Sequence, residues 1–300
     1  MQLEIMLFFQ RLRTPLTEKI AEIISIFGEI AVPLVIIMLF LWCFNRKKAF
    51  ALSLSLLSSL IVTQSLKAIF RSPRPFQVHP DLIDGGRLST ATGYSFPSGH
   101  STTSGALYSS LIVVFWKKAA TIICTLLIIL VPLSRLMLGV HWPIDVSVGT
   151  AIGLLGGFLL TPLALRLYDN RRAFLIVTFI YGIIASAGGL ILALILGLTD
   201  ADPVAFEDLM STATITGAVM LGFYLERKLV DSAPEKNSLW KRILTFIVGI
   251  MTTAIAAVII MIIPAPAAFT SFALYYMIGI WAVFIYPLIA VKIGLMKKEA

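Results

Sequence analysis

The chain has 300 residues, of which 58% are hydrophobic and 13% are charged, and its mean hydropathy is +0.94. Soluble domains carry about 25% charged residues, so this composition excludes an ordinary soluble domain and indicates a protein with several membrane spans. The net charge of +8 is compatible with nucleic acid or anionic lipid as a partner. Its distribution along the chain instead predicts membrane orientation, with no nucleic-acid partner.

Residues 1–20 mix charged side chains with large apolar ones. The segment lacks the long apolar centre and the small-residue cleavage site that define a signal peptide. We therefore predict an amphipathic helix that lies at the membrane interface.

Nine apolar runs follow, each close to the roughly 20 residues that a spanning helix needs. They lie near residues 21–44, 49–71, 100–116, 119–138, 144–167, 173–198, 206–227, 241–263 and 269–295, and the third is the shortest. Cys43 and Cys124 lie inside such runs, so we expect two small buried side chains and no disulfide or zinc site. The sequence predicts an all-α polytopic membrane bundle of about nine transmembrane helices after the interfacial helix.

Lysine and arginine gather on one side of the predicted bundle. With nine spans, that side holds the 1–2, 3–4, 5–6 and 7–8 connections and the C-terminus, which contain most of the basic residues. The connection on the other side at residues 200–208 is acidic. The positive-inside rule makes the basic side cytoplasmic and places the three motifs described next on the extracytoplasmic side. The short connections suggest a bacterial plasma membrane.

Three cations lie at the C-terminal end of the second span. Lys67, Arg71 and Arg74 fall at i, i+4 and i+7, so a continuing helix would project them from one face. Pro73 and Pro75 predict that the helix ends near Arg71. Charge at mid-bilayer costs about 2.5–3.5 kcal/mol per residue, so three cations are tolerable at a helix mouth if they snorkel or share an anion. An ordinary interfacial basic cluster is the alternative.

The segment Pro97-Ser98-Gly99-His100 opens the next apolar run and predicts a helix N-terminus. Unpaired backbone N–H groups at such an end can hold phosphate, with Gly99 permitting close approach and the Ser98 hydroxyl adding a donor. His100 then faces the anion from the first turn. A plain N-cap explains the same residues.

The third motif joins the fourth span to the fifth: Arg135 ends one, while His141 and Asp145 bracket the start of the other. An aspartate four residues after a histidine can accept the proton of one ring nitrogen and leave the other nitrogen as a nucleophile. A His–Asp helix cap is the alternative. Two of the three histidines lie in these motifs on one predicted face, which favours a phosphate site over unrelated features.

Together the motifs resemble the KxxxxxxRP, PSGH and SRxxxxxHxxxD signature of the type 2 phosphatidic acid phosphatase (PAP2) superfamily. Every signature position matches, in order, within residues 67–145. The resemblance implies a membrane lipid phosphatase with a helical core over roughly residues 50–170. We therefore predict an interfacial helix at 1–20, a PAP2-like membrane core with the active site at 21–172, and additional transmembrane helices of unknown role at 173–300.

The resemblance also implies metal-independent chemistry through a covalent phosphohistidine, with no metal site and no cofactor. His141 would attack phosphorus, Asp145 would orient it, and His100 would protonate the leaving oxygen and then activate water. The residues expected to hold the phosphoryl oxygens are Lys67, Arg74, Ser98, Gly99 and Arg135. Arg71 lies outside the signature, so its supporting role is a hypothesis beside the alternative of an interfacial cation.

Two further patterns concern the neighbouring spans. Glu22 and Glu29 share a helical face of the first span, where they either line the mouth of the pocket, pair with a cation or make ordinary polar contacts. Gly149, Gly153 and Gly157 form two GxxxG steps, which predict close helix approach within the monomer.

We therefore expect a phosphatase that hydrolyses a lipid phosphate or diphosphate, of the undecaprenyl diphosphate, phosphatidylglycerophosphate or phosphatidic acid type. A lipid phosphotransferase and a soluble sugar-phosphate phosphatase remain alternatives with the same site. A transporter or flippase is the alternative from another class, although phosphate binding alone needs cations and no nucleophile. The expected partners are a membrane lipid phosphate and the bilayer, and the sequence leaves the oligomeric state open.

Overall fold

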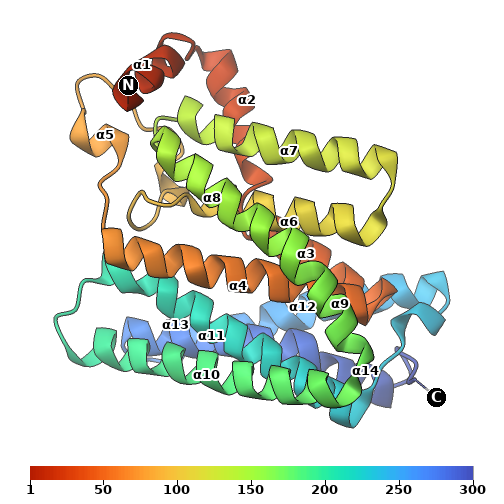
Figure 1. Cartoon of the computed structure of the whole chain (residues 1–300). Coiled ribbons are helices and arrows are strands. Elements are labelled where there is room, and N and C mark those ends of the chain that lie inside the picture. The colour runs from red at the N-terminus through yellow and green to blue at the C-terminus, as the bar shows by residue number, and fades with distance from the viewer. Residues whose placement is uncertain (300) are drawn as a thin grey trace. The chain divides into compact units, whose positions relative to one another are not determined.

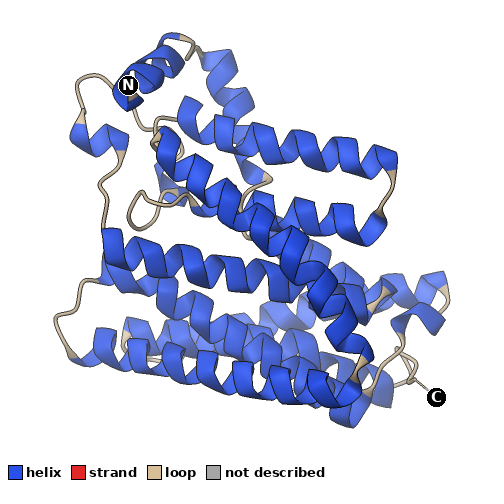
Figure 2. Cartoon of the chain, in the orientation of Figure 1, coloured by secondary structure: helices blue, strands red, loops and turns tan. Residues whose placement is uncertain are grey.

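The computed structural model describes residues 1–299, most of them in helices (Figure 1, Figure 2). No β-strand occurs in this part of the chain, so the predicted all-α class is confirmed. The helices are α1 (Gln2–Arg11), α2 (Pro15–Ile26), α3 (Ala31–Leu39), η1 (Phe40–Phe44), α4 (Arg46–Phe70), α5 (Pro75–Val78), η2 (Leu88–Thr90), α6 (Gly99–Phe115), α7 (Lys118–Met137), α8 (Pro143–Leu155), η3 (Gly156–Leu160), α9 (Thr161–Asp169), α10 (Arg171–Leu198), α11 (Pro203–Leu225), η4 (Glu226–Val230), η5 (Pro234–Lys236), α12 (Leu239–Met261), α13 (Ala267–Ile280), η6 (Trp281–Ile285) and α14 (Tyr286–Lys292).

Eight helical segments within residues 1–299 are long and apolar enough to cross a membrane. They are Pro15–Phe44, Arg46–Val78, Lys118–Met137, Pro143–Asp169, Arg171–Leu198, Pro203–Val230, Leu239–Met261 and Ala267–Lys292. These segments correspond to all predicted spans except the one near 100–116. That run forms α6, whose 17 residues make it too short for this set. Cys43 and Cys124 are buried and form no disulfide, as predicted.

The N-terminal segment forms two helices, where the sequence predicted one over residues 1–20. The chain breaks between α1 and α2 because Thr14 caps α2 and Pro15 occupies its first position. The Thr14 hydroxyl accepts a hydrogen bond from the amide of Thr17 at 3.2 Å. Further along α2, Glu22 pairs with Lys19 at 3.0 Å, which is one of the fates expected for that acid.

The chain divides into two compact units. The first contains Met1–Leu34 and Ser55–Pro162, and the second contains Val35–Leu54 and the chain from Leu163 onward. All three motifs lie in the first unit, so the geometry of the site can be described within it.

In the first unit, α6 packs closely against α8 as well as against α7 (Figure 1). A Cβ added at Gly149 would lie 2.5 Å from the carbonyl oxygen of Ser98, and one at Gly157 would clash with the hydroxyl oxygen of Ser109 in α6. Gly153 is equally tight, with a carbonyl oxygen of α6 at 2.5 Å. The close approach predicted from the GxxxG steps is therefore confirmed. It lets the Ser98 amide at the start of α6 donate to the Asp145 carbonyl at the start of α8, at 3.0 Å.

In the second unit, α10 pairs with α11, and α13 packs against α10, α11 and α12. A buried ion-pair network joins the start of α4 to η4 and the residues after it. Arg46 donates from Nη1 to both carboxylate oxygens of Glu226, at 2.8 and 2.6 Å, and from Nη2 to Asp231 at 3.0 Å. The Ser232 amide also donates to Glu226, at 2.9 Å. Both charges of the central pair thus have partners, as burial requires.

We expect Glu226→Gln to lower the free energy of unfolding by about 3 kcal/mol, because removal of one partner leaves Arg46 buried with too little compensation. A titration with a denaturing detergent in mixed micelles measures this change. Glu235→Gln is the matched control: Glu235 is exposed, so we expect a change within about 0.5 kcal/mol. An equally small change for both variants would contradict the prediction.

Candidate active site

The first motif lies at the end of α4 and the start of the following loop. Lys67, in the last turn of α4, is buried. Arg71 adopts a left-handed backbone conformation with φ 46°, and its Nε donates to the carbonyl of Ala68 at 3.1 Å. These contacts fit a residue that ends the helix. The supporting role of Arg71 in the site stays a prediction.

Arg74 is held by the main chain of two other segments and is only 2% exposed. Its guanidinium donates to the carbonyls of Thr92 at 2.6 Å, Gly93 at 3.2 Å and Val140 at 2.9 Å. Nη1 also lies 3.2 Å from Nε2 of His141. Arg74 therefore ties the first motif to the third and fixes a cation beside the imidazole.

The two ring nitrogens of His141 face different partners. A guanidinium has only donors, so Nε2 beside Arg74 is the acceptor and the ring proton lies on Nδ1. Nδ1 lies 3.5 Å from both Asp145 Oδ2 and Ser95 Oγ. Burial, followed by the charge of Arg74 and neighbouring cations, lowers the pKa of His141 well below its ordinary value of 6.5. The ring is neutral at pH 7 with an unprotonated Nε2, which is the state that a nucleophile requires.

Asp145 is buried and lies in the first turn of α8. Its Oδ2 accepts hydrogen bonds from the Trp142 amide at 2.7 Å and from Ser95 Oγ at 2.5 Å. The bond to Trp142 is a helix-capping contact, so the alternative of a cap is correct in part. The same carboxylate also faces His141. Asp145 thus combines the cap of α8 with a position beside the imidazole.

The second motif forms the start of α6. The Ser98 hydroxyl accepts hydrogen bonds from the amide and the hydroxyl of Ser101, at 3.4 and 3.0 Å, so the N-cap alternative is correct for this side chain. Its contact with phosphate stays a prediction. A Cβ at Gly99 would meet no atom within 4 Å, so the packing of the protein does not require a glycine there. His100 follows in the first turn and has a buried Nε2 without a partner in residues 1–299.

Arg135 is fully buried in the last turn of α7. Its Nη1 donates to Ser25 Oγ at 2.6 Å, whereas Nε and Nη2 are buried without a partner in the described chain. Unpaired buried donors on a charged group are costly, so they indicate that an anion is the intended partner. A phosphoryl group suits these donors and His100 because its oxygens accept several hydrogen bonds.

The three motifs converge in the first unit. Lys67, Arg74 and Arg135 all lie close enough to His141 to act on its charge. Across residues 1–299, no group of three or more His, Cys, Asp or Glu side chains is arranged to hold a metal ion. The donor set of three cations, two imidazoles and one carboxylate suits an anion instead. The individual roles of these residues stay predictions.

Two family models match this chain. The PAP2 superfamily model matches residues 48–172, which include all three motifs. The model described as "PAP2 superfamily phosphatase, transmembrane extension" matches residues 209–298. The chain belongs to the PAP2 superfamily. Its PAP2 domain contains the site described above, and the transmembrane extension lies in the second unit.

Several curated proteins resemble this PAP2 protein. It is 28% identical over 128 residues to undecaprenyl-diphosphatase BcrC of Bacillus subtilis, and 28% identical over 155 residues to phosphatidylglycerophosphatase B of Escherichia coli. It is 38% identical over 103 residues to lipid A 1-phosphatase of Rhizobium johnstonii. These matches cover 41%, 38% and 32% of this chain, and 64%, 61% and 39% of the three relatives. The chain therefore spans less than two thirds of each relative.

Two residues of the PAP2 site were missed by sequence reasoning, namely Ser25 and Ser95. Ser95 lies just before the second motif, where its position in a polar loop gave no distinct signal. Ser25 had one: it shares a face with Ala21 and Gly28, and these small residues stand at i, i+4 and i+7 in a run of larger apolar ones. All three are buried, which matches the packing of α2 against α7.

We expect Ser95→Ala to lower kcat of the PAP2 site about 10- to 100-fold and to leave KM within about twofold. The substitution removes the hydroxyl beside Asp145 and Nδ1 of His141, so the imidazole loses orientation while the cations remain. Steady-state phosphate release in detergent measures both constants. Ser104→Ala is the matched control, because Ser104 is equally buried and its hydroxyl donates to a carbonyl of its own helix at 3.1 Å. Equal rates for the two variants would contradict the prediction.

Proposed function

We propose that this PAP2 protein hydrolyses a lipid phosphate or a lipid diphosphate through a covalent phosphohistidine on His141. The observation that carries the proposal is the set of buried nitrogens without partners, two on Arg135 and one on His100, together with the neutral imidazole of His141 and its unprotonated Nε2. Cations alone would suit any anion. A neutral nucleophile among the cations suits an anion that can be attacked at phosphorus, such as a phosphate ester.

In the proposed reaction, Nε2 of His141 attacks phosphorus and the bond to the leaving oxygen breaks. His100 gives a proton to that oxygen and then takes one from the water that releases phosphate. Asp145, on the side of Nδ1, stabilises the positive charge that develops on the ring. Lys67, Arg74 and Arg135, with Ser98 and the Gly99 amide, hold the phosphoryl oxygens. Positioning and charge stabilisation are most of what phosphoryl transfer requires of a protein.

The proposed substrates are amphiphiles whose tails stay in the bilayer while their head groups reach the cations. The many apolar helices support this choice, as do relatives named for undecaprenyl diphosphate, phosphatidylglycerophosphate and lipid A. We place the site on the extracytoplasmic face, because the basic connections of the chain favour the opposite face as cytoplasmic. For the helices after residue 172, the prediction stays that they are additional transmembrane helices outside the PAP2-like core.

Phosphate release by the purified protein in detergent with EDTA tests the proposal. The panel contains undecaprenyl diphosphate, phosphatidylglycerophosphate, phosphatidic acid and a soluble sugar phosphate, each with and without a lipid acceptor. Release of inorganic phosphate from a lipid substrate in the presence of the chelator supports hydrolysis. Transfer of the phosphate to the acceptor would favour a phosphotransferase. No release and no transfer by folded protein would contradict the proposal and favour a transporter.

A further inference from the structure

An arginine–glutamate pair lies near the proposed site. Arg87 donates from Nε and Nη2 to the same oxygen of Glu29, at 2.8 and 2.5 Å. The two side chains are 25% and 22% exposed, so the pair is partly open to solvent. The pairing of Glu29 with a cation is one of the fates that the sequence left open. Neither residue belongs to the PAP2 signature.

Glu29 follows a glycine that packs against His100, the residue proposed to protonate the leaving group. It stands in the break between α2 and α3, where a Cβ on the preceding Gly28 would lie 3.1 Å from both Cβ and the carbonyl oxygen of His100. The Tyr108 hydroxyl of α6 donates to the carbonyl of Phe27 at 2.8 Å and holds the break in this position. The acid is therefore on the leaving-group side of the site.

Arg87 is paired with Glu29 and is more exposed than the fully buried Arg135. It is close enough to act electrostatically on both His100 and Arg135. The amide of the preceding Gly86 donates to the Leu138 carbonyl at 2.8 Å, which ties the loop to the end of α7. Arg135 and Arg87 thus form an inner and an outer cation, with His100 near both.

We propose that Arg87 binds the leaving phosphate of a lipid diphosphate, and that Glu29 holds Arg87 in position until such a substrate arrives. This inference rests on the proposed function. In the reaction, Nε2 of His141 attacks the terminal phosphorus, the bridging P–O bond breaks, and its electron pair goes to the lipid monophosphate that leaves. The leaving group of a phosphate monoester is an alcohol, which offers Arg87 no charge. Arg87 therefore favours diphosphates.

The exchange of partners by Arg87 is physically accessible. A partly exposed ion pair contributes little stability, because water screens it and because two side chains must be ordered to form it. A phosphate brings a larger negative charge and several acceptor oxygens, so it competes well with one carboxylate oxygen. Glu29 can then turn toward solvent without being buried as an uncompensated charge.

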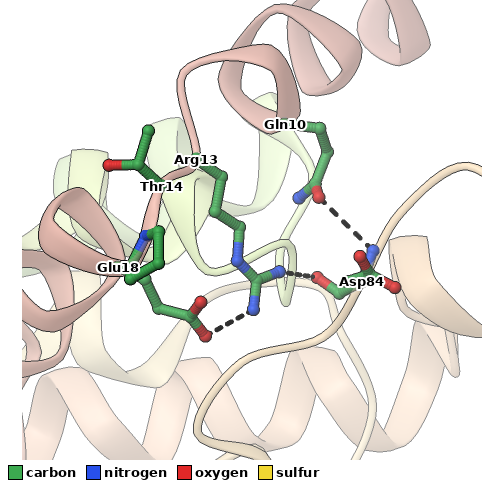
Figure 3. A pocket seen from close by; sticks show the side chains of 6 residues that line it. Gln10, Arg13, Thr14, Glu18 and Asp84 are labelled. Atoms are coloured by element: carbon green, nitrogen blue, oxygen red, sulfur yellow. Dashed lines mark hydrogen bonds and ion pairs between the residues drawn. The ribbon is translucent and has the colours of Figure 1, made fainter.

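A matched control, Arg13, lies between α1 and α2 and contacts the loop that carries Arg87. Arg13 donates to Glu18 at 2.5 Å and to the carbonyl of Asp84, while Gln10 accepts from the Asp84 amide at 3.4 Å (Figure 3). These side chains line a small polar pocket of about 240 Å³. Arg13 is fully engaged in fixing the loop, and its contacts lie on the loop and on α2. Removal of Arg13 therefore tests the loss of loop anchoring alone.

The experiment compares farnesyl diphosphate with farnesyl phosphate, which share a tail and differ in the leaving group. We expect Arg87→Gln to lower kcat/KM for the diphosphate roughly 10- to 100-fold and to change that for the monophosphate less than about threefold. Arg87→Lys should recover part of the loss. Glu29→Gln weakens the hold on Arg87, so it should change kcat/KM for the diphosphate more than that for the monophosphate. Arg13→Gln should affect both substrates alike.

A binding measurement separates this inference from the reaction itself. Methylenediphosphonate, whose bridging carbon is not cleaved, should raise the unfolding temperature of the wild type more than methylphosphonate does, and Arg87→Gln should remove the difference. Equal losses for both farnesyl substrates, or no loss for either, would overturn the assignment of Arg87 while leaving the proposed function intact. A wild type that hydrolyses neither substrate and shows no diphosphonate preference would overturn both.

Discussion

His141→Gln should lower kcat for phosphate release by about 10⁴-fold or more, because it removes the nitrogen that attacks phosphorus. Glutamine is close in size to histidine, and its carbonyl can still accept a hydrogen bond from Arg74, so the buried site should remain formed. The wild type should also become labelled by a ³²P-labelled substrate. Phosphohistidine survives base and is lost in acid, and a base quench followed by gel separation detects it. The variant should carry no label.

The chain supplies a control for this result. His79 is the third histidine, and its ring packs edge-on against Trp142 with centroids 6.1 Å apart. We expect His79→Gln to keep kcat within about threefold, since its ring has no place in the proposed reaction. Equal loss in both variants would point to general destabilisation. Base-stable label on the His141 variant would place the nucleophile elsewhere.

Arg135→Met should lower kcat/KM by about 10²- to 10³-fold, the usual effect of removing a preorganised donor from a developing negative charge. Its Nε and Nη2 have no partner in residues 1–299, and the proposed phosphoryl group would accept from both. Arg166→Met is the control, because Arg166 is an exposed arginine of α9. We expect the control to keep kcat/KM within about twofold.

The stability of the Arg135 variant should move in the opposite direction from its activity. Methionine is also long and unbranched. It removes the two buried donors without partners at the cost of one hydrogen bond to Ser25, so the unfolding temperature of the ligand-free protein should stay the same or rise. Vanadate, which resembles phosphate, should raise the unfolding temperature of the wild type and not that of the variant. Lower stability together with retained vanadate stabilisation would mean that Arg135 serves the fold alone.

Much of the site could be predicted because its chemistry is concentrated in short segments. Lys67, Arg74 and Arg135 stand out in a chain that otherwise excludes charge from its apolar runs. The GxxxG steps around Gly153 also gave a correct packing prediction, since a repeated small residue has few other uses in a spanning helix. These signals depend on the spacing of nearby residues, which can be recognised in a single sequence.

The contacts made over long sequence separations could not be predicted. Ser25 reaches Arg135 across 110 residues, and Arg87 reaches Glu29 across 58, and in both cases the partner is chosen by packing rather than by spacing. Pro15 is a local signal for the break between α1 and α2, but the apolar pattern across it favoured one continuous helix. The run near 100–116 was also the shortest of the predicted spans, and α6 has 17 residues.

The contact between α6 and α8 restricts how this protein can accommodate different head groups. Because carbonyl oxygens of α6 lie within 2.5 Å of where methyl groups would stand at Gly149 and Gly153, that wall of the site has no room to adjust. The side of the site that holds the nucleophile is therefore rigid, because the glycines let the two helices pack in direct contact. If Arg87 binds the leaving phosphate as proposed, substrate selectivity lies in the loop that carries Arg87 and in the break that carries Glu29. Substitutions there can retune the substrate while the reacting atoms keep their places.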